Sequence, residues 1–332
     1  MPFSDPQRDD YRELAAVYDD WQYLYPQPFA LSLRPRLVSV LDEFSTPRES
    51  YADLGCGTGL LAAWWKQRYP EWHVFGVDRS PAMIERALQT ATRSAQKQAL
   101  MQWGLTTRGL RASSFDEMMA AAEQMQAGGP APSPPTTSLA DSRGSATDIT
   151  ADQPQDQAPS KSGVDFRVQG LDAIDLPEPI GLATCVFDGI NHILRVPDLV
   201  AAFRSIRSSL AEGGLFVFDL VHEAVFAEAF DGAVVRKGPG LVVTADSIHF
   251  TRGDHLFGKT TFAVFREENG AWRRYDAEIS ERCWRRKEIV EALESAGLSL
   301  LRQDDIDPAK EPEFQLPRTF WICRRPLEGS HR

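Results

Sequence analysis

Three glycines at alternate positions of one segment could form a ligand-binding turn. Residues 51–59 read YADLGCGTG, and the glycines are Gly55, Gly57 and Gly59. Since glycine has no side chain to obstruct a ligand, the backbone can turn sharply there and approach it closely. The apolar stretch LLAAWWKQRY after the turn predicts a helix whose first N–H groups lack helical partners. The next strand-like run, HVFGVD, ends in Asp78, and a carboxylate at that place can accept hydrogen bonds from ribose hydroxyls.

The spacing of this turn distinguishes two nucleotide cofactors. A nicotinamide dinucleotide site needs GxGxxG, because the third glycine lets a helix pack closely over a pyrophosphate. This chain has GxGxG, with Leu60 at the position of that third glycine. The carboxylate of Asp53 would repel a phosphate at low dielectric, but it suits the ammonium of S-adenosylmethionine, which has no pyrophosphate. We therefore expect S-adenosylmethionine as cofactor, and competition with a nicotinamide cofactor would test the alternative of an oxidoreductase.

Strand and helix patterns alternate around this turn and would position it. VDFRVQ, GLATCVF and LFVFDL have the length of strands, and Pro197 opens a helix with apolar residues at helical spacing. This alternation favours an α/β fold in which helices cover both faces of a parallel sheet. In such a doubly wound sheet, ligands bind at the carboxyl ends of the strands near the topological switch point.

The composition divides the chain into unequal parts. Residues 1–104 hold an N-terminal helical segment, over 8–45, and the first half of the α/β domain, and residues 163–326 hold the second half. Between them, residues 105–162 are rich in Pro, Ser, Thr, Gly and Asp, so we expect a disordered insertion that cannot bury a core. Successive strand patterns at about 232–282 predict a small antiparallel sheet inserted between two crossover units.

Three segments together resemble the class I S-adenosylmethionine-dependent methyltransferases of the small-molecule type. They read DLGCGTG, VFGVDRSPAMIERA and LAEGGLFVFDL, and the resemblance covers roughly 50–100 and 163–325. It implies a Rossmann-like sheet of seven strands whose last strand, here RTFWICRR, runs antiparallel. It also implies that the turn and the next strand end bind the cofactor, with Asp53 and Gly55 near the methionine part, Cys56, Gly57 and Gly59 in the same turn, Asp78 on the ribose, and Arg79 and Ser80 near the adenosine.

The resemblance also implies an acidic residue beside the adenine amino group, after the third strand. The sequence reads Gln169-Gly170-Leu171-Asp172 there. Strict spacing puts Gly170 or Leu171 at that place. Asp172 is the candidate for the adenine contact because it is acidic, although its spacing does not match.

The strand GLATCVF delivers a polar loop to the carboxyl edge of the sheet. Methyl transfer requires a nucleophile in line with the sulfonium carbon and, where needed, a base that removes its proton. His192 could be that base because its reference pKa is near neutrality; alternatively, it caps a helix or packs beside it. Asp188 could hydrogen-bond either the loop backbone or a substrate amine. The stretch FDGINHIL resembles the same loop of amino-sugar N-methyltransferases, some of which have a histidine there.

Aromatic residues near the N-terminus supply a third catalytic candidate. In the resembling families an N-terminal helix covers the cofactor, with a tyrosine near the methyl group, and Tyr18 in VYDDW is that candidate. The alternative is an aromatic face packed on the core. Arg282, Trp284 and Arg285 follow the inserted sheet and could face substrate, although packing at the surface or in the core is favoured for them.

Composition and charge exclude several partners. The net charge is −11 and the pI about 5.1, which disfavours nucleic-acid binding because phosphate neutralisation needs clustered Lys and Arg. The four cysteines are far apart, so no metal site is expected. The polar N-terminus and the absence of a long apolar run predict a cytoplasmic protein with no membrane contact. We expect a monomer or homodimer.

These observations favour methyl transfer to N or O of a small-molecule acceptor. One alternative is a catalytically silent regulatory module that binds S-adenosylmethionine. Another is a protein or RNA methyltransferase, although CVFDGIN stands where base N-methylating enzymes have an NPPY-like tetrapeptide.

Overall fold

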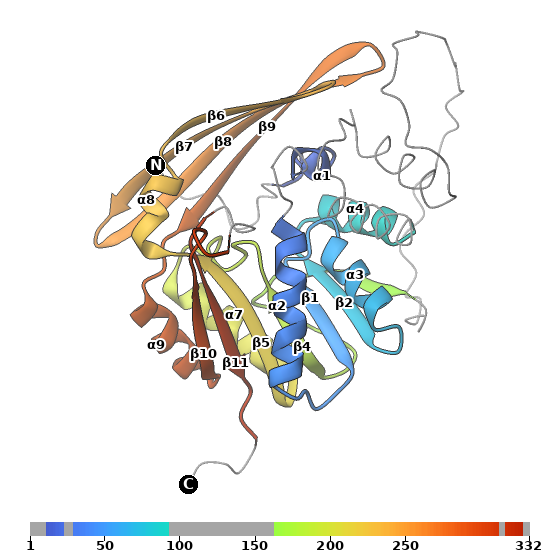
Figure 1. The fold of residues 1–332 in the computed structure, drawn as a ribbon, viewed down its shortest axis with the longest axis vertical. Helices are drawn as coiled ribbons and strands as arrows, with labels where there is room; N and C mark the ends of the chain where they lie inside the picture. Colours follow the sequence, from blue (N-terminus) through green and yellow to red (C-terminus); the bar gives the residue numbers. More distant parts are fainter. Residues whose placement is uncertain (1–10, 23–28, 93–162, 312–315, 328–332) are drawn as a thin grey trace.

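The main sheet of the chain has seven strands, and a second sheet of four strands lies over one edge of it (Figure 1). The computed structural model describes residues 11–22, 29–92, 163–311 and 316–327. The strands of the main sheet are β1 (Ser50–Leu54), β2 (His73–Asp78), β3 (Val164–Val168), β4 (Ile180–Cys185), β5 (Leu210–Val221), β10 (Ser299–Ile306) and β11 (Arg318–Arg324).

The strand order confirms the predicted doubly wound fold. The order is β10-β11-β5-β4-β1-β2-β3, and β1 to β5 pair in parallel while β11 runs antiparallel to β5. The chain winds outward from β1 in both directions, so the switch point lies between β1 and β4. The carboxyl ends of these two strands are therefore neighbours, and this is where such a sheet binds its ligands.

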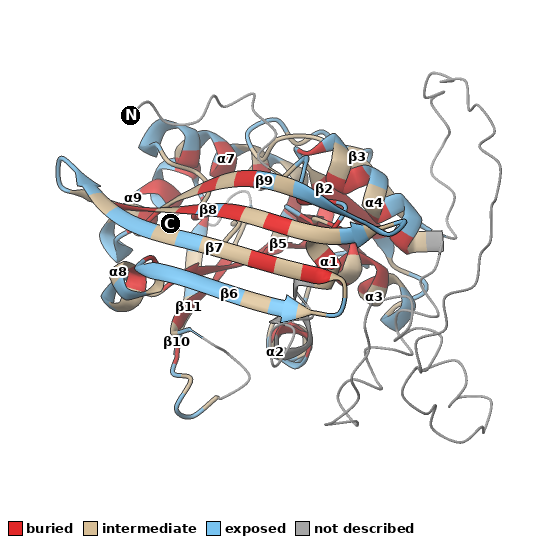
Figure 2. Ribbon diagram, turned by 90° about the horizontal axis from the view of Figure 1, so that it is seen from above, coloured by how far each residue is buried: buried red, intermediate tan, exposed pale blue. Residues whose placement is uncertain are grey.

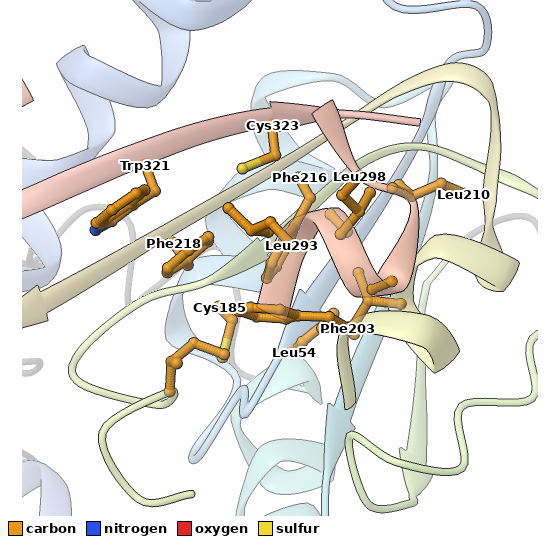
Figure 3. Close-up of a cluster of buried hydrophobic side chains, with 14 of the residues drawn as sticks. Leu54, Cys185, Phe203, Leu210, Phe216, Phe218, Leu293, Leu298, Trp321 and Cys323 are labelled. Atoms are coloured by element: carbon orange, nitrogen blue, oxygen red, sulfur yellow. The ribbon is translucent and has the colours of Figure 1, made fainter. Parts of the chain in front are cut away.

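Helices cover both faces of the main sheet. On one face, α2 (Phe29–Glu43) and α3 (Leu60–Arg68) bury Leu37 and Trp65, and α4 (Pro81–Thr92) packs beside α3. On the other, α7 (Val196–Ser209) and α9 (Arg286–Ala296) bury Phe203 and Leu293 against Phe218 (Figure 3). The strands β1, β4 and β11 are buried on both faces, and their interior positions are mostly apolar.

The inserted sheet has the four antiparallel strands that the sequence predicts. Its order is β6-β7-β8-β9, and it follows the short helix α8 (Phe226–Ala229). One side packs on the N-terminal segment and the other stays largely exposed, most clearly along β6 (Figure 2). The strands are β6 (Gly232–Gly238), β7 (Leu241–Arg252), β8 (His255–Glu268) and β9 (Ala271–Arg282).

The N-terminal segment differs from the helix expected over residues 8–45. Residues 11–17 form turns, followed by α1 (Tyr18–Gln22) and, after a gap in the description, α2. Leu14 and Val17 are fully buried against the inserted sheet, so tertiary contacts determine the backbone of this segment. Helical spacing in the sequence reflected the apolar side of the segment rather than a continuous helix.

Some predictions concern features that the described residues cannot test or only partly test. The predicted insertion at 105–162 lies outside them. Within the described residues, no helix is long and apolar enough to cross a bilayer. In that same part of the chain, no group of His, Cys, Asp and Glu residues could hold a metal ion.

Candidate active site

The glycine turn follows β1 and is fixed to the end of β2. The N–H groups of Gly55 and Cys56 both donate to the carbonyl of Val77, at 2.7 and 2.9 Å. Gly55 and Gly57 have φ of +71° and +52°, and a Cβ added to either would meet nothing within 4 Å. The backbone is therefore bent into a conformation that favours glycine, beside space that a ligand can occupy.

Gly59 has a different structural role from Gly55 and Gly57. Its φ is +76°, and a Cβ built there would lie 2.7 Å from the Phe166 ring and 2.9 Å from the Ala87 side chain. Contacts this short leave no room for a side chain where α3 begins. The structure places Gly59 in helix packing, while Gly55 and Gly57 border the open space.

Asp78 connects the turn to the start of α4. Its Oδ2 accepts a hydrogen bond from the Gly57 N–H at 2.9 Å, and its Oδ1 accepts one from the Ser80 N–H at 2.8 Å. Each carboxylate oxygen has a further lone pair, so both can also accept from a ribose hydroxyl. Arg79 is exposed beside it, and Asp172 is exposed in the turn after β3.

Asp53 is a buried carboxylate whose hydrogen-bond partners among the described residues are neutral. It is 3% exposed and accepts a hydrogen bond from the Thr184 hydroxyl at 3.4 Å, and Thr184 is itself bonded to the Tyr51 hydroxyl at 2.7 Å. Burial, and then the charge of Asp78, raises the pKa of Asp53 to about 7 against the opposing hydrogen bonds from Thr184 and the Ala62 backbone. An ammonium beside Asp53 would supply the charge that the protein does not.

We expect the Asp53→Asn substitution to stabilise the ligand-free protein at pH 8. Between the reference pKa of 3.8 and the native pKa of about 7, the native state holds more protons than the unfolded state, so the Asp53 contribution falls as pH rises. The gain of the variant over the wild type should thus exceed the gain at pH 5 by about 2 kcal/mol. Urea unfolding at both pH values measures this difference.

Asp165→Asn is the matched control for this prediction. Asp165 lies on β3 and is paired with Arg167 at 2.8 Å, so its neutralisation should give no stabilisation at pH 8. An Asp53→Asn gain that is the same at both pH values would show that the carboxylate is not strained by burial.

The loop after β4 is held in an unusual conformation by a charged cluster. Phe187 and Asp188 have φ of 65° and 62°, a region that side chains other than glycine rarely adopt. The Asp188 carboxylate pairs with Arg318, and one of these bonds measures 3.1 Å. The same guanidinium donates to the Asp219 carboxylate at 2.5 Å, and Asp219 accepts from the Phe187 N–H at 2.8 Å. These contacts together compensate the backbone strain.

His192 belongs to an aromatic group from two parts of the chain, in which Tyr11 contacts both His192 and Tyr18. Its Nε2 is 3.1 Å from the Tyr11 hydroxyl, and the two rings meet edge to face, with centroids 5.8 Å apart. Tyr18 in turn contacts the Tyr11 ring at 6.0 Å. Burial lowers the pKa of His192, against the charge of Asp188 and a hydrogen bond to the Ser280 backbone. The ring is therefore neutral near pH 7 and can accept a proton.

The N-terminal segment joins the glycine turn to the His192 group. The Thr58 hydroxyl donates to the Asp19 carboxylate at 2.6 Å, and both residues are buried. Arg266 of β8 donates to the Ala16 carbonyl at 2.9 Å and pairs with Asp20. The inserted sheet thus holds α1 over the carboxyl edge of the main sheet (Figure 1).

The structure brings most of the predicted catalytic residues together. His192, Asp188 and, through Tyr11, Tyr18 belong to one group of contacts above the switch point. Trp284, by contrast, is buried, and its indole N–H donates to the carbonyls of the His192 loop. Arg282 pairs with Glu288, and Arg285 donates to a backbone carbonyl, so all three residues after the inserted sheet have packing roles.

Sequence reasoning missed four residues of this site. Tyr11 is one of the aromatic residues near the N-terminus, where Tyr18 was the predicted catalytic residue. Asp219 and Arg318 had no predicted role, nor did Glu281, on which the charges of Asp188 and Arg318 act. The sequence did contain an indication of Arg318, because this arginine begins the mostly apolar strand RTFWICR. An arginine in a buried strand usually has a charged partner. Glu281 also follows the alternating apolar residues of β9 on their side of the strand.

Comparison with known proteins agrees with this geometry. Residues 52–132 match the family described as a methyltransferase domain. The trans-aconitate 2-methyltransferase of Pseudomonas paraeruginosa is 33% identical over 97 residues, which are 29% of this chain and 35% of that protein. That of Escherichia coli is 41% identical over 69 residues, 20% of this chain and 27% of the relative. The chain thus spans about a third of the length of the curated relatives it matches.

Solved structures resemble the whole fold. An S-adenosylmethionine-dependent methyltransferase from Clostridium acetobutylicum superposes with a TM-score of 0.61 at 15% identity, over 95% of this chain and 99% of that one. The amino pentose methyltransferase CalS10 from Micromonospora echinaspora, solved with bound S-adenosylmethionine, has a TM-score of 0.54 at 16% identity, over 93% and 96% of the two chains. Identities this low establish the fold alone.

Fold and domain point to the same class of protein. Residues 52–132 match a methyltransferase domain, and the fold superposes on solved S-adenosylmethionine-dependent methyltransferases, as the sequence predicts. The glycine turn and Asp78 suit S-adenosylmethionine, the cofactor in the names of those proteins.

Proposed function

We propose that this chain transfers a methyl group from S-adenosylmethionine to N or O of a small-molecule acceptor. The observation that carries the proposal is the buried carboxylate of Asp53, which has no cationic partner within the described residues and lies beside the glycine turn and Asp78. A cationic amino-acid group, an unobstructed backbone and ribose hydroxyls are the three features that this arrangement complements. Small-molecule acceptors are supported by the amino pentose enzyme that shares the fold.

The cofactor supplies an activated methyl group on a sulfonium. Asp53 would hold the ammonium end, Asp78 the ribose, and the space beside Gly55 and Gly57 the atoms between them. In the transfer, the acceptor's lone pair would form the new bond to the methyl carbon. The electrons of the broken sulfur–carbon bond would remain on sulfur. His192 would take the proton that the acceptor loses.

A titration and a product assay test this function. S-adenosylmethionine, titrated into the folded protein in a calorimeter, should bind at one site per chain, and a nicotinamide dinucleotide should not compete. Incubation with cofactor and a pool of small metabolites should then produce S-adenosylhomocysteine. Binding without any turnover would favour the silent regulatory module, and absence of binding would exclude the methyltransferase.

The His192→Ala substitution should lower turnover by at least about 100-fold, the usual contribution of a general base. Cofactor affinity should change less than threefold, because within the described residues His192 bonds to Tyr11 and the Ser280 backbone and not to the glycine turn. Tyr11→Phe is the control that removes the hydroxyl on His192 and keeps the ring. Unchanged turnover of His192→Ala, once its acceptor is known, would remove His192 from the mechanism.

Several finer features stay predictions. They are a monomeric or homodimeric assembly, a cytoplasmic location, the roles of Asp172 and Arg79 at the adenosine, and the disordered insertion at 105–162. Size-exclusion chromatography with light scattering measures the assembly, and limited proteolysis locates a disordered insertion.

A further inference from the structure

Glu281 lies close enough to Tyr11 and Asp188 for their charges to interact, on the side of β9 that packs toward the N-terminal segment. Ala277 and Ile279 are buried on that side, and Glu281 follows them at the two-residue period of a strand. The backbone of the preceding residue, Ser280, forms a hydrogen bond with His192. An acidic side chain therefore takes the place where the preceding alternation has apolar residues.

One oxygen of the Glu281 carboxylate has no hydrogen-bond partner within the described part of the protein. This atom, Oε2, is buried. Burial, and then the charge of Asp188, raises the pKa of Glu281 well above its ordinary value, although the Arg318 charge opposes this. A buried oxygen without a partner destabilises a protein, so a ligand that donates to it would relieve that cost.

The ionisable groups around Glu281 are predominantly acidic. Asp188 and Asp219 act on its carboxyl group, and the cation that acts on it within the described residues is the guanidinium of Arg318. Arg318 is already shared between the two aspartates through the bonds described above. Arg79, a cation that acts on His192, is exposed and therefore better screened by solvent.

We propose that Glu281 is a specificity-determining residue of the acceptor subsite and that the acceptor carries a protonated aliphatic amine. An ammonium has three N–H donors and the positive charge that this group of carboxylates lacks. A polycarboxylate such as trans-aconitate, the substrate in the name of the curated relatives, would meet like charges at this place. The inference rests on the proposed methyltransferase function and narrows its substrate class.

Matched probes test the proposal in the protein loaded with S-adenosylhomocysteine. Cyclohexylamine, cyclohexanol and cyclohexanecarboxylate have one ring and differ in charge, and their binding can be followed by ligand-observed NMR. The wild type should bind the amine at least about tenfold tighter than either other probe, equivalent to about 1.4 kcal/mol. Glu281→Gln should remove this preference and leave cyclohexanol binding unchanged.

Two further variants make the result specific. Asp276→Asn neutralises an exposed carboxylate of the same strand, paired with Arg274, and should keep the preference for the amine. Glu281→Asp retains the charge and should keep most of that preference. Thermal unfolding of each variant confirms that it folds, and Glu281→Asp remains informative if the glutamine variant does not.

The outcomes separate this proposal from the proposed function. If S-adenosylhomocysteine binds but the amine binds no better than the other probes, including the case in which none binds up to its solubility limit, the role of Glu281 is refuted alone. If the amine preference survives in Glu281→Gln, the preference has another source and the proposal is also refuted. If S-adenosylhomocysteine itself does not bind, the methyltransferase function fails first.

Discussion

The Asp78→Ala substitution should weaken S-adenosylmethionine binding by at least about 100-fold. A hydrogen bond to a charged group contributes about 1.5–3 kcal/mol, and a carboxylate that accepts two ribose hydroxyls would lose both bonds. The substitution also removes the acceptor for the Gly57 N–H and the Ser80 N–H, so the glycine turn loses its connection to the start of α4. Both effects act on the same site and in the same direction.

Calorimetric titration of S-adenosylmethionine measures this loss. Asp78→Asn separates the two causes, because its amide oxygen can still accept one backbone bond while the charge is gone. Asp165→Ala, on the adjacent strand β3, is the control and should leave the affinity unchanged. An Asp78→Ala affinity within about threefold of the wild type, a difference of less than 1 kcal/mol, would mean that the cofactor does not contact this carboxylate.

The Arg318→Met substitution should destabilise the protein by about 3–5 kcal/mol at pH 8, the usual cost of removing one partner from a buried ion pair. Asp188 and Asp219 would be left close together without the guanidinium that they share. Even with Arg318 present, burial raises the pKa of Asp219 to about 6. Without it, the Asp219 carboxyl group should bind a proton more readily, so the variant should lose less stability at pH 5 than at pH 8.

Urea unfolding at the two pH values tests this sign. Arg302→Met is a suitable control because Arg302 also lies between two carboxylates, those of Glu43 and Asp304, but its side chain is 31% exposed. A pair screened by solvent to this extent should contribute less than about 1 kcal/mol. Equal losses in the two variants would contradict the interpretation of Arg318 as a buried electrostatic anchor.

The cofactor half of the site could be predicted from the sequence because it is local. The turn, the strand before it and the helix after it lie within a short stretch, and glycine spacing reflects backbone geometry directly. Asp78 could be placed as well, since a parallel sheet aligns the ends of adjacent strands. The parallel sheet covered by helices on both faces followed from the alternation of strands and helices, and the antiparallel last strand was implied by the resemblance.

The partners of His192 and Asp188 could not be predicted, because they come from distant segments of the chain. Arg318 lies 130 positions from Asp188 in the sequence, and Tyr11 lies 181 positions from His192. Only the inserted sheet and β11 bring them together, and no local pattern encodes those contacts. The helical spacing over residues 8–45 was similarly ambiguous, because an apolar side that docks on a sheet gives the same pattern as a helix.

The turns and short helix that contain Tyr11 and Asp19 touch both halves of the site at once, through His192 and Thr58. A nucleoside bound beside the glycine turn would lie next to Thr58, so its entry and release are expected to depend on how readily the Thr58–Asp19 hydrogen bond opens.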